Sequence, residues 1–127
     1  MPFKKVFSKL STFNRARKYN YFIQKFSPQK DSTILDVGFC NCDYSAEANY
    51  LEKNHPYPES ITALGLESSG TDVFEKLFPK VKVVTYDGII FPFAADSFDY
   101  VWSNAVLEHV GGEASQIRFV SEMLRVG

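Results

Sequence analysis

The stretch from Thr33 to Cys42, Thr-Ile-Leu-Asp-Val-Gly-Phe-Cys-Asn-Cys, limits the folds open to this chain more than any other feature. A short apolar run ends in an acid, a valine and a glycine, and small and polar residues follow. This pattern predicts a buried parallel strand that turns sharply toward a helix, as in the first loop of nucleotide-binding α/β folds. We therefore expect residues 33–38 to form a strand and Gly38 to open a ligand-binding loop.

Apolar runs alternate with helical patterns along the rest of the chain. We expect further strands over residues 61–66, 81–86 and 98–103, helices over residues 43–53, 70–78 and 112–126, and a loop over residues 89–96. In these helices we expect an N-terminal cap at Asp43 and shared apolar sides formed by Tyr44, Ala48 and Leu51, by Val73, Phe74 and Leu77, and by Ile117, Val120, Met123 and Leu124. The alternation favours an α/β fold with a mostly parallel, Rossmann-like sheet of about four strands between helical layers.

The first 30 residues differ in charge from the remainder. They contain eight basic residues and no acid, which leaves the other 97 residues with six basic residues against all 15 acids. Phe3, Val6, Phe7, Leu10 and Phe13 recur at helical spacing, and Tyr19, Phe22, Ile23 and Phe26 continue it as far as Ser27-Pro28. We therefore divide the chain into a basic amphipathic helical segment, residues 1–30, and a ligand-binding domain, residues 31–127.

The basic segment allows several interpretations. We favour a helix that caps the domain through its phenylalanines, because most amphipathic helices pack on a core. Weak contact with an anionic membrane or a phosphate group, and a cleaved targeting peptide, are the alternatives. The aromatic residues between the basic ones are explained by helical periodicity, so no specific nucleic-acid site is expected.

The length of 127 residues indicates one domain at most, and no apolar run approaches the roughly 18 residues that cross a membrane. The two cysteines, Cys40 and Cys42, stand too close in sequence to staple the fold usefully, so we expect buried, inert thiols in a reducing, cytoplasmic setting. A metal site built from Cys40, Cys42, His55 and His109 is the alternative. It is disfavoured because Cys-x-Cys lacks the wider spacing of common zinc knuckles.

Polar residues and glycines follow the end of every expected strand. These are Asp36 and Gly38 after the first, Glu67 after the second, Asp87 and Gly88 after the third, and Ser103 and Asn104 after the fourth. Ligands of parallel α/β sheets bind outside the carboxyl ends of the strands, so we expect a nucleoside-binding edge there. Glu67 is placed to accept hydrogen bonds from ribose hydroxyls, and Asp87 from an adenine amino group. A nicotinamide-dependent oxidoreductase is disfavoured, because its fingerprint requires glycine at Cys40 and Asp43.

Four blocks of sequence together suggest a family. They are Ile34-Leu35-Asp36-Val37-Gly38, then Leu64-Gly65-Leu66-Glu67, then Tyr86-Asp87-Gly88, and finally the run from Phe91 through Ser103-Asn104 to Leu107-Glu108-His109-Val110. Residues 33–126 resemble the class I S-adenosylmethionine-dependent methyltransferases, and the last block is similar to their small-molecule branch. The resemblance implies a seven-stranded Rossmann-like fold, S-adenosylmethionine as cofactor and a small-molecule methyl acceptor.

The resemblance also implies roles for individual residues. Asp36, Gly38 and Phe39 are expected to hold the amino-acid end of the cofactor, Glu67 the ribose, Asp87 and Gly88 the adenine, and Ser103 and Asn104 the floor near the methyl group. Cys40 and Ser68 complete the expected cofactor-binding set. His109 is the candidate base, because histidine is the side chain type that most readily exchanges a proton near neutral pH. A structural histidine that packs under the last helix is the alternative interpretation.

Two departures from the family pattern affect the predicted function. The family's Gly-x-Gly-x-Gly loop reads Gly38-Phe39-Cys40-Asn41-Cys42 here, and the family continues beyond Gly127 with further strands. We therefore expect a partial domain of about four strands whose fourth strand forms an open edge that favours self-association. The predicted function is methyl transfer to an O, N or C atom of a small molecule. The alternative is an inactive remnant that binds a nucleoside or another protein.

Overall fold

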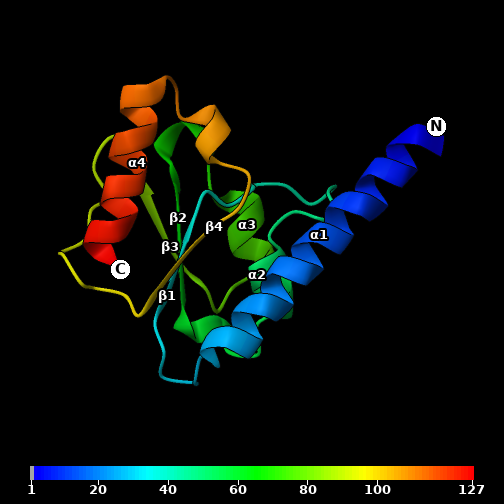
Figure 1. Cartoon of the computed structure of the whole chain (residues 1–127), viewed down its shortest axis with the longest axis horizontal. Helices are drawn as coiled ribbons and strands as arrows, with labels where there is room; N and C mark the ends of the chain where they lie inside the picture. The colour runs from blue at the N-terminus through cyan, green and yellow to red at the C-terminus, as the bar shows by residue number, and fades with distance from the viewer. Residues whose placement is uncertain (1) are drawn as a thin grey trace.

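The structure is a computed structural model that describes residues 2–127, although the side chains of residues 2–4 and 7 lie outside the description. The elements follow one another as α1 (Pro2–Phe26), β1 (Ile34–Val37), α2 (Tyr50–Asn54), η1 (Pro58–Ser60), β2 (Ile61–Leu66), η2 (Glu67–Ser69), α3 (Asp72–Leu77), β3 (Lys82–Tyr86), β4 (Tyr100–Ser103), η3 (Leu107–His109) and α4 (Glu113–Val126) (Figure 1). The α and η elements are α-helices and short 3-10 helices.

The strands form one four-stranded, all-parallel sheet in the order β3-β2-β1-β4. This confirms the α/β class and the parallel sheet predicted from the alternation of elements. Asp36 of β1 stands in register with Ala63 of β2 on one side and Trp102 of β4 on the other. The chain order reverses at β1, which is where open α/β sheets bind ligands. Among the described residues β4 pairs only with β1, so its outer edge has no strand partner.

Helices cover both faces of the sheet (Figure 1). Ile34 of β1 packs in a cluster with Phe22 of α1, Leu51 of α2 and Phe74 of α3. On the opposite face, Leu35 and Val37 pack in a second cluster with Phe119 and Val126 of α4. Successive side chains of a strand point to opposite faces, so β1 contributes to both clusters and is buried throughout. The result is the predicted three-layer arrangement.

Only part of α1 packs on the domain. Tyr19 and Phe22 are buried and lie edge-on to Trp102, with ring centroids 6.5 and 5.5 Å away. Val6, Leu10 and Phe13 are 63%, 54% and 60% exposed, and the N-terminal part of the helix projects away from the sheet (Figure 1). The expected capping by phenylalanines is therefore wrong for Phe13, while the side chains of Phe3 and Phe7 lie outside the described ones.

The physical reason for the projection is length. A helix of 25 residues is about 37 Å long, whereas four strands about 4.8 Å apart span only about 14 Å. The helix is longer than the surface on which it packs, so its apolar periodicity continues past the edge of the domain.

The segment after β1 differs from the prediction. The helix expected over residues 43–53 forms only over Tyr50–Asn54, and Tyr44 is 86% exposed instead of sharing a face with Leu51. Asn49 adopts a left-handed conformation, φ 54° and ψ 41°, and its side chain accepts from the Cys40 N–H and donates to the Cys40 carbonyl, both at 2.8 Å. These two hydrogen bonds hold the chain in a loop up to α2, so Asp43 caps no helix.

The buried sides of α3 and α4 also differ from the prediction. Leu77 of α3 is 46% exposed, although Phe74 is fully buried as expected. On α4, the side chains of Ile117, Val120 and Leu124 are exposed, and of the four expected to share a side only Met123 packs against the core. The buried stripe of α4 instead contains Phe119, Glu122 and Val126. The buried acid breaks the apolar pattern from which the side was predicted.

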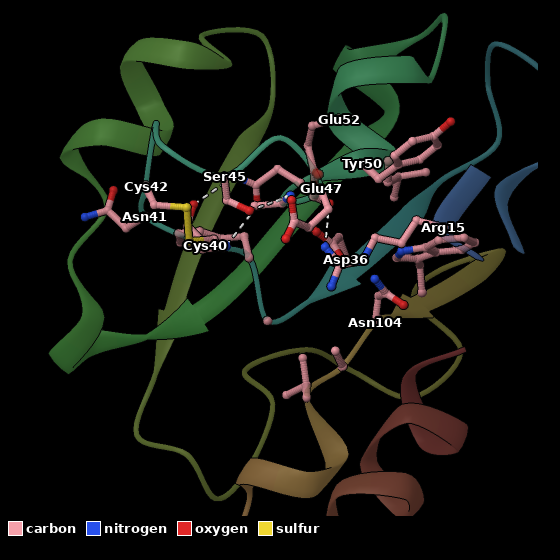
Figure 2. A pocket seen from close by; sticks show the side chains of 18 of the residues that line it. Arg15, Asp36, Cys40, Asn41, Cys42, Ser45, Glu47, Tyr50, Glu52 and Asn104 are labelled. Atoms are coloured by element: carbon pink, nitrogen blue, oxygen red, sulfur yellow. Dashed lines mark hydrogen bonds between the residues drawn. A yellow bond between two sulfur atoms is a disulfide. The ribbon is translucent and has the colours of Figure 1, made fainter. Parts of the chain in front are cut away.

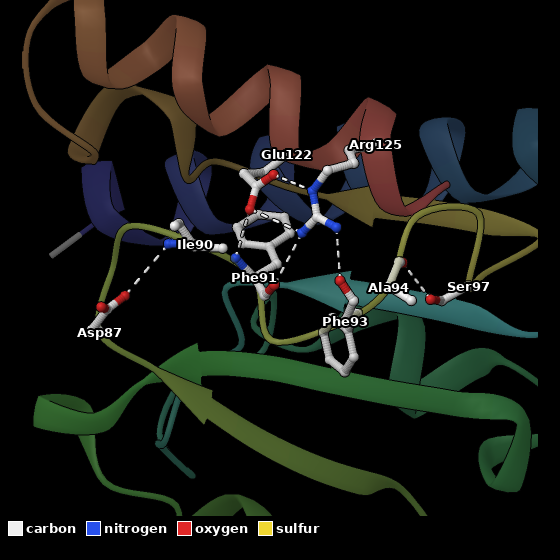
Figure 3. Close-up of polar contacts among 8 residues, drawn as sticks. All are labelled: Asp87, Ile90, Phe91, Phe93, Ala94, Ser97, Glu122 and Arg125. Atoms are coloured by element: carbon white, nitrogen blue, oxygen red, sulfur yellow. Dashed lines mark hydrogen bonds and ion pairs between the residues drawn. The ribbon is translucent and has the colours of Figure 1, made fainter.

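Glu122 can lie in the buried stripe because its carboxylate is fully bonded. Its Oε1 accepts from the Phe91 N–H at 2.9 Å, and both oxygens accept from Arg125 (Figure 3). Arg125 also donates to the carbonyls of Phe93 and Phe91 at 2.8 and 3.1 Å. The neighbouring guanidinium lowers the pKa of Glu122. The stabilisation is therefore present at neutral pH and is lost as the pH falls through that lowered pKa.

The packing around Phe74 gives a test of the core. Phe74→Ala should lower the free energy of unfolding by about 3–5 kcal/mol, because it leaves a cavity in the core. The Phe74 ring packs against the rings of Phe39 and Phe78, with ring centroids 4.3 and 4.9 Å apart. Leu77→Ala on the same helix is the matched control and should cost less than about 1 kcal/mol. Urea unfolding of the three proteins measures both values, and equal losses in the two variants would contradict this packing.

Candidate functional site

Two adjoining cavities open at the carboxyl ends of the strands, with volumes of about 620 and 500 Å³. Both are lined by Gly38, Phe39, Ser69, Ala105 and Val106, so they meet where β1 ends. Asp36, Glu52 and Arg15 line the larger cavity (Figure 2). Each volume lies in the range of about 300–1,000 Å³ that is typical of small-molecule sites.

Gly38 makes the turn between β1 and the loop. Its φ is +91°, and its N–H donates to the Leu64 carbonyl at 2.8 Å. A Cβ at this position would lie 2.3 Å from Cγ2 of Val106, so the close approach of the 105–110 segment also requires a glycine. The glycine turn expected from the sequence is therefore present. Both the positive φ and the contact with Val106 require a residue without a side chain at this position.

Phe39 and Asn41 anchor the loop after Gly38 to the sheet and to α3. The Phe39 ring stacks on Phe74 and lies over Gly65, where a Cβ would come within 2.6 Å of the ring. Asn41 accepts from the Phe74 N–H at 2.9 Å and donates to Asp72 at 3.0 Å. The loop is therefore fixed at several points beside the larger cavity.

Cys40 and Cys42 form a disulfide across Asn41 (Figure 2). The prediction of two inert thiols is therefore wrong. Their spacing is no obstacle, because the loop turns at Asn41 and the two Cα atoms lie 5.3 Å apart, within the usual range for a disulfide. Both sulfurs are thus engaged with each other, and the described residues contain no group of three or more His, Cys, Asp or Glu side chains that could hold a metal ion.

Two carboxyl groups meet at the wall of the larger cavity. Asp36 of β1 and Glu52 of α2 are only 6% and 5% exposed, and among the described residues no group outside the pair donates a hydrogen bond to a Glu52 oxygen. Burial raises the pKa of both groups, and the Asp36 carboxyl raises that of Glu52 further. The pair therefore retains a proton at a pH where an exposed carboxyl is ionised, and that proton can supply a hydrogen bond between the two groups.

Helix α1 contributes Arg15 to the lining of this cavity, and its Lys18 contacts Asn104, another lining residue. Arg15 donates to the Glu47 carbonyl at 2.5 Å. Lys18 lies 4.7 Å from the centre of the Trp102 ring and donates to the Ser103 carbonyl at 2.6 Å and to the Asn104 side chain at 3.2 Å. Burial lowers the pKa of Lys18, and the negative charge of Asp36 opposes that shift. These contacts join the basic segment to the carboxyl end of β4.

The structure brings most of the predicted site residues to the cavities. Asp36, Gly38, Phe39, Cys40 and Asn104 line the larger one, while Gly38, Phe39, Gly88 and His109 line the smaller one. Ser103 ends β4, and its hydroxyl donates to the Val37 carbonyl at 3.2 Å. The site residues expected at the end of β1 and β4 are thus neighbours in space.

Four predicted residues lie at the rim. Glu67 and Ser68 are exposed in η2, and Asp87 is exposed, with its carboxylate accepting from the Ile89 N–H at 2.9 Å. None of these three lines either cavity, although their chain neighbours Leu66, Ser69 and Gly88 do. The side chain of His109 is 77% exposed in η3 and lies 3.8 Å from the Glu108 carboxylate. His109 therefore does not pack under α4, as the structural interpretation expected.

The sequence did not reveal three further residues of the site. Arg15 and Lys18 were assigned to a separate basic segment, although their helical spacing relative to the buried Tyr19 and Phe22 was a usable signal. Glu52 gave no sequence signal of a role in the site, because an acid beside a lysine in a short helix is typical of an exposed surface. The carboxyl pair becomes visible only when α2 is placed over β1.

Comparison with known proteins assigns the family. The sequence model of the methyltransferase domain family matches residues 35–127, and this chain belongs to that family. No curated protein matches the sequence. The fold is similar to the crystal structure of a TehB-like SAM-dependent methyltransferase from Corynebacterium glutamicum, with a TM-score of 0.52 and 15% sequence identity over 90% of this chain and 67% of that one.

These findings confirm the predicted family resemblance and the α/β fold class. They define the class of protein as a methyltransferase domain built on a four-stranded parallel sheet. In the part of the chain that the structure describes, no helix is long and apolar enough to cross a membrane.

The contact between Gly38 and Val106 gives a test of the site's architecture. Gly38→Ala should lower the free energy of unfolding by about 2–4 kcal/mol, from the positive φ and from the overlap with Val106. Adding Val106→Ala should recover part of the overlap term, giving a coupling energy of about 1 kcal/mol.

Gly112→Ala is the matched control, because nothing lies within 4 Å of the added Cβ and its φ of −74° suits any residue. It should change stability by less than about 0.5 kcal/mol. Chemical denaturation of five proteins provides the values: the wild type, Gly38→Ala, Val106→Ala, the double variant and Gly112→Ala. A Gly38→Ala protein as stable as the Gly112→Ala protein would contradict the contact.

Proposed function

We propose that this chain binds S-adenosylmethionine across the two adjoining cavities and transfers its methyl group to a small-molecule acceptor. The observation that carries the proposal is that the two cavities adjoin at the end of β1, where both are lined by Gly38 and Val106. The larger cavity is lined by the two buried carboxyl groups, and the smaller one is lined by Gly65, Leu66, Tyr86 and Gly88. An amino acid joined to an adenosine has matching ends: one charged and one flat, largely apolar.

Each half of the site has its proposed residues. Asp36, Gly38, Phe39 and Cys40 hold the amino-acid end in the larger cavity, and Ser103 and Asn104 form the floor near the methyl group. In the smaller cavity Asp87 and Gly88 bind the adenine. Glu67 binds the ribose hydroxyls, with Ser68 beside it, after its exposed side chain turns from the rim toward Leu66. The proposal is supported by family membership and by the position of all these residues at strand ends.

The chemical work left to the protein is modest. The bound cofactor supplies a methyl group that its sulfonium already activates. The chain's own residues position the acceptor and exclude water. Arg15 and Lys18 hold α1 over the larger cavity, and Asn104 is held in place by Lys18. Where the acceptor must lose a proton, His109 is the proposed base, since its exposed imidazole can pass that proton to solvent.

Binding of the reaction product tests the proposal directly. The full chain should bind S-adenosylhomocysteine in calorimetry, and Glu67→Ala should weaken that binding by about 10- to 100-fold, because a charged acceptor for the ribose hydroxyls is lost. Glu75→Ala, an exposed acid on α3, is the control and should leave the affinity unchanged. Absence of any binding to the wild-type chain would overturn the proposal.

A second role, self-association, is favoured by the surface beside β4. The exposed side chains of Val120 and Leu124 on α4 line an apolar hollow of about 320 Å³, together with Val106, Phe119 and Met123. The outer edge of β4 lacks a strand partner among the described residues. We propose that a second copy of this chain pairs along β4, since an identical edge offers the matching backbone donors and acceptors.

Sedimentation velocity distinguishes this role from a monomer. The wild-type chain should dimerise, and Leu124→Glu should shift it to monomer, because the charge would be buried against the partner's apolar surface. Leu77→Glu is the matched control, since Leu77 is exposed on α3. It should leave the dimer intact. A wild-type protein that remains monomeric at high concentration would exclude the second role without affecting the first.

A further inference from the structure

We infer that the buried Asp36–Glu52 pair is a proton-exchanging site for a ligand ammonium group, which takes the place of the proton that the two carboxyls share. The inference rests on the proposed function, because it assigns the ligand that enters the larger cavity. It goes further in naming Glu52 as a binding residue and in requiring that a proton leave as the ligand binds.

The position of the pair provides the first argument. Asp36 lies on β1 and Glu52 on α2, and both side chains line the 620 Å³ cavity (Figure 2). Both are more than nine-tenths buried, and no other group among the described residues donates to either Glu52 oxygen. The shared proton is therefore the one donor that the pair has, and a ligand with several donors would satisfy both buried carboxylates.

The neighbouring cations are engaged elsewhere. Lys18 of α1 donates to Ser103 and Asn104, Arg15 donates to the Glu47 carbonyl, and Lys53 of α2 donates to the Ser45 and Ala46 carbonyls at 3.0 and 3.3 Å. No hydrogen bond joins any of these three side chains to the pair. The other ionisable side chains that the described residues contribute to the cavity lining are Tyr44, Tyr50 and Glu47, and the Glu47 carboxylate accepts from Ser8.

An ammonium group fits this arrangement. It presents three donors and no acceptor, and it carries the charge that two neighbouring carboxylates need in order to ionise together. The empty pair holds one proton and one negative charge. When the ammonium binds, both carboxyls become carboxylates and the shared proton passes to solvent, so one proton is released for each ligand bound.

This exchange fixes the sign of the pH dependence. Burial raises the pKa of Asp36 and, together with the neighbouring Asp36, that of Glu52, so the proton is present in the free protein below that raised pKa. In that range the affinity should rise with pH, by up to about tenfold per unit. The rise ends where the pair is already ionised in the free protein.

Two ligands carry an ammonium group: the amino-acid end of the cofactor and an amine that accepts the methyl group. Three probes separate them in calorimetry of the full chain between pH 5.5 and 7.5. They are S-adenosylhomocysteine, 5′-deoxy-5′-methylthioadenosine, which lacks the amino-acid end, and butylammonium at millimolar concentration. Each titration is repeated in two buffers with different ionisation enthalpies, which counts the protons released by the wild-type protein.

We expect S-adenosylhomocysteine to release one proton and to bind more tightly as the pH rises, and methylthioadenosine to release none. Glu52→Gln should abolish the proton release and lower the affinity for S-adenosylhomocysteine at least tenfold. It should leave the affinity for methylthioadenosine unchanged. Glu47→Gln is the matched control, a carboxyl beside the same cavity that has its own partner, and should change neither quantity.

The outcomes separate the two proposals. If both nucleosides bind without proton release, the inference is overturned and the proposed function stands. If only butylammonium binds, with proton release that Glu52→Gln abolishes, the ammonium site is supported, its ligand is an amine and the cofactor proposal fails. If no probe releases a proton on binding, the ammonium site is excluded. The proton count uses the wild-type chain, so it decides the question even if Glu52→Gln does not fold.

Discussion

The burial of β1 on both faces and along both edges is the constraint on which the rest of the structure depends. β2 and β4 pair with its edges, α1 and α2 cover one face, and α4 covers the other. Since side chains alternate along a strand, Leu35 and Val37 face α4 while Asp36 faces the opposite layer. That acid is buried and lines the larger cavity. The buried carboxyl pair of the site exists because an acid stands in this central strand.

The sequence was most informative where apolar runs decide the structure alone. The strand β2 matches its predicted bounds, 61–66, and the other strands differ by at most two residues at either end. It was least informative where side chains bond to distant backbone groups. Asn49 and the disulfide hold residues 43–49 in a loop, and Arg125 allows Glu122 to replace an apolar residue in the buried stripe of α4. Such pairings depend on contacts that particular side chains make in the folded chain, and hydrophobic periodicity does not predict them.

The site was predictable to the extent that topology creates it. Parallel strands place all their carboxyl ends at one edge, so Asp36, Gly38, Gly88 and Asn104 could be grouped from the order of the strands along the sequence. Arg15 and Glu52 could not be grouped with them, because helices set their positions independently of strand order. Glu67 and Asp87 show the limit of the rule: strand-end position puts a residue at the rim, and its side chain must still turn inward.

The long sequence separations between residues in contact have a consequence for the order of folding. Lys18 meets Ser103 across 85 residues, and Thr33 bonds Asp99 across 66. Contacts of such separation form late, after loop closure has brought the ends of the chain together. The larger cavity is therefore complete only after β4 has packed beside β1 and α1. A ligand bound there stabilises only the completely assembled chain, so its occupancy reports that folding has finished.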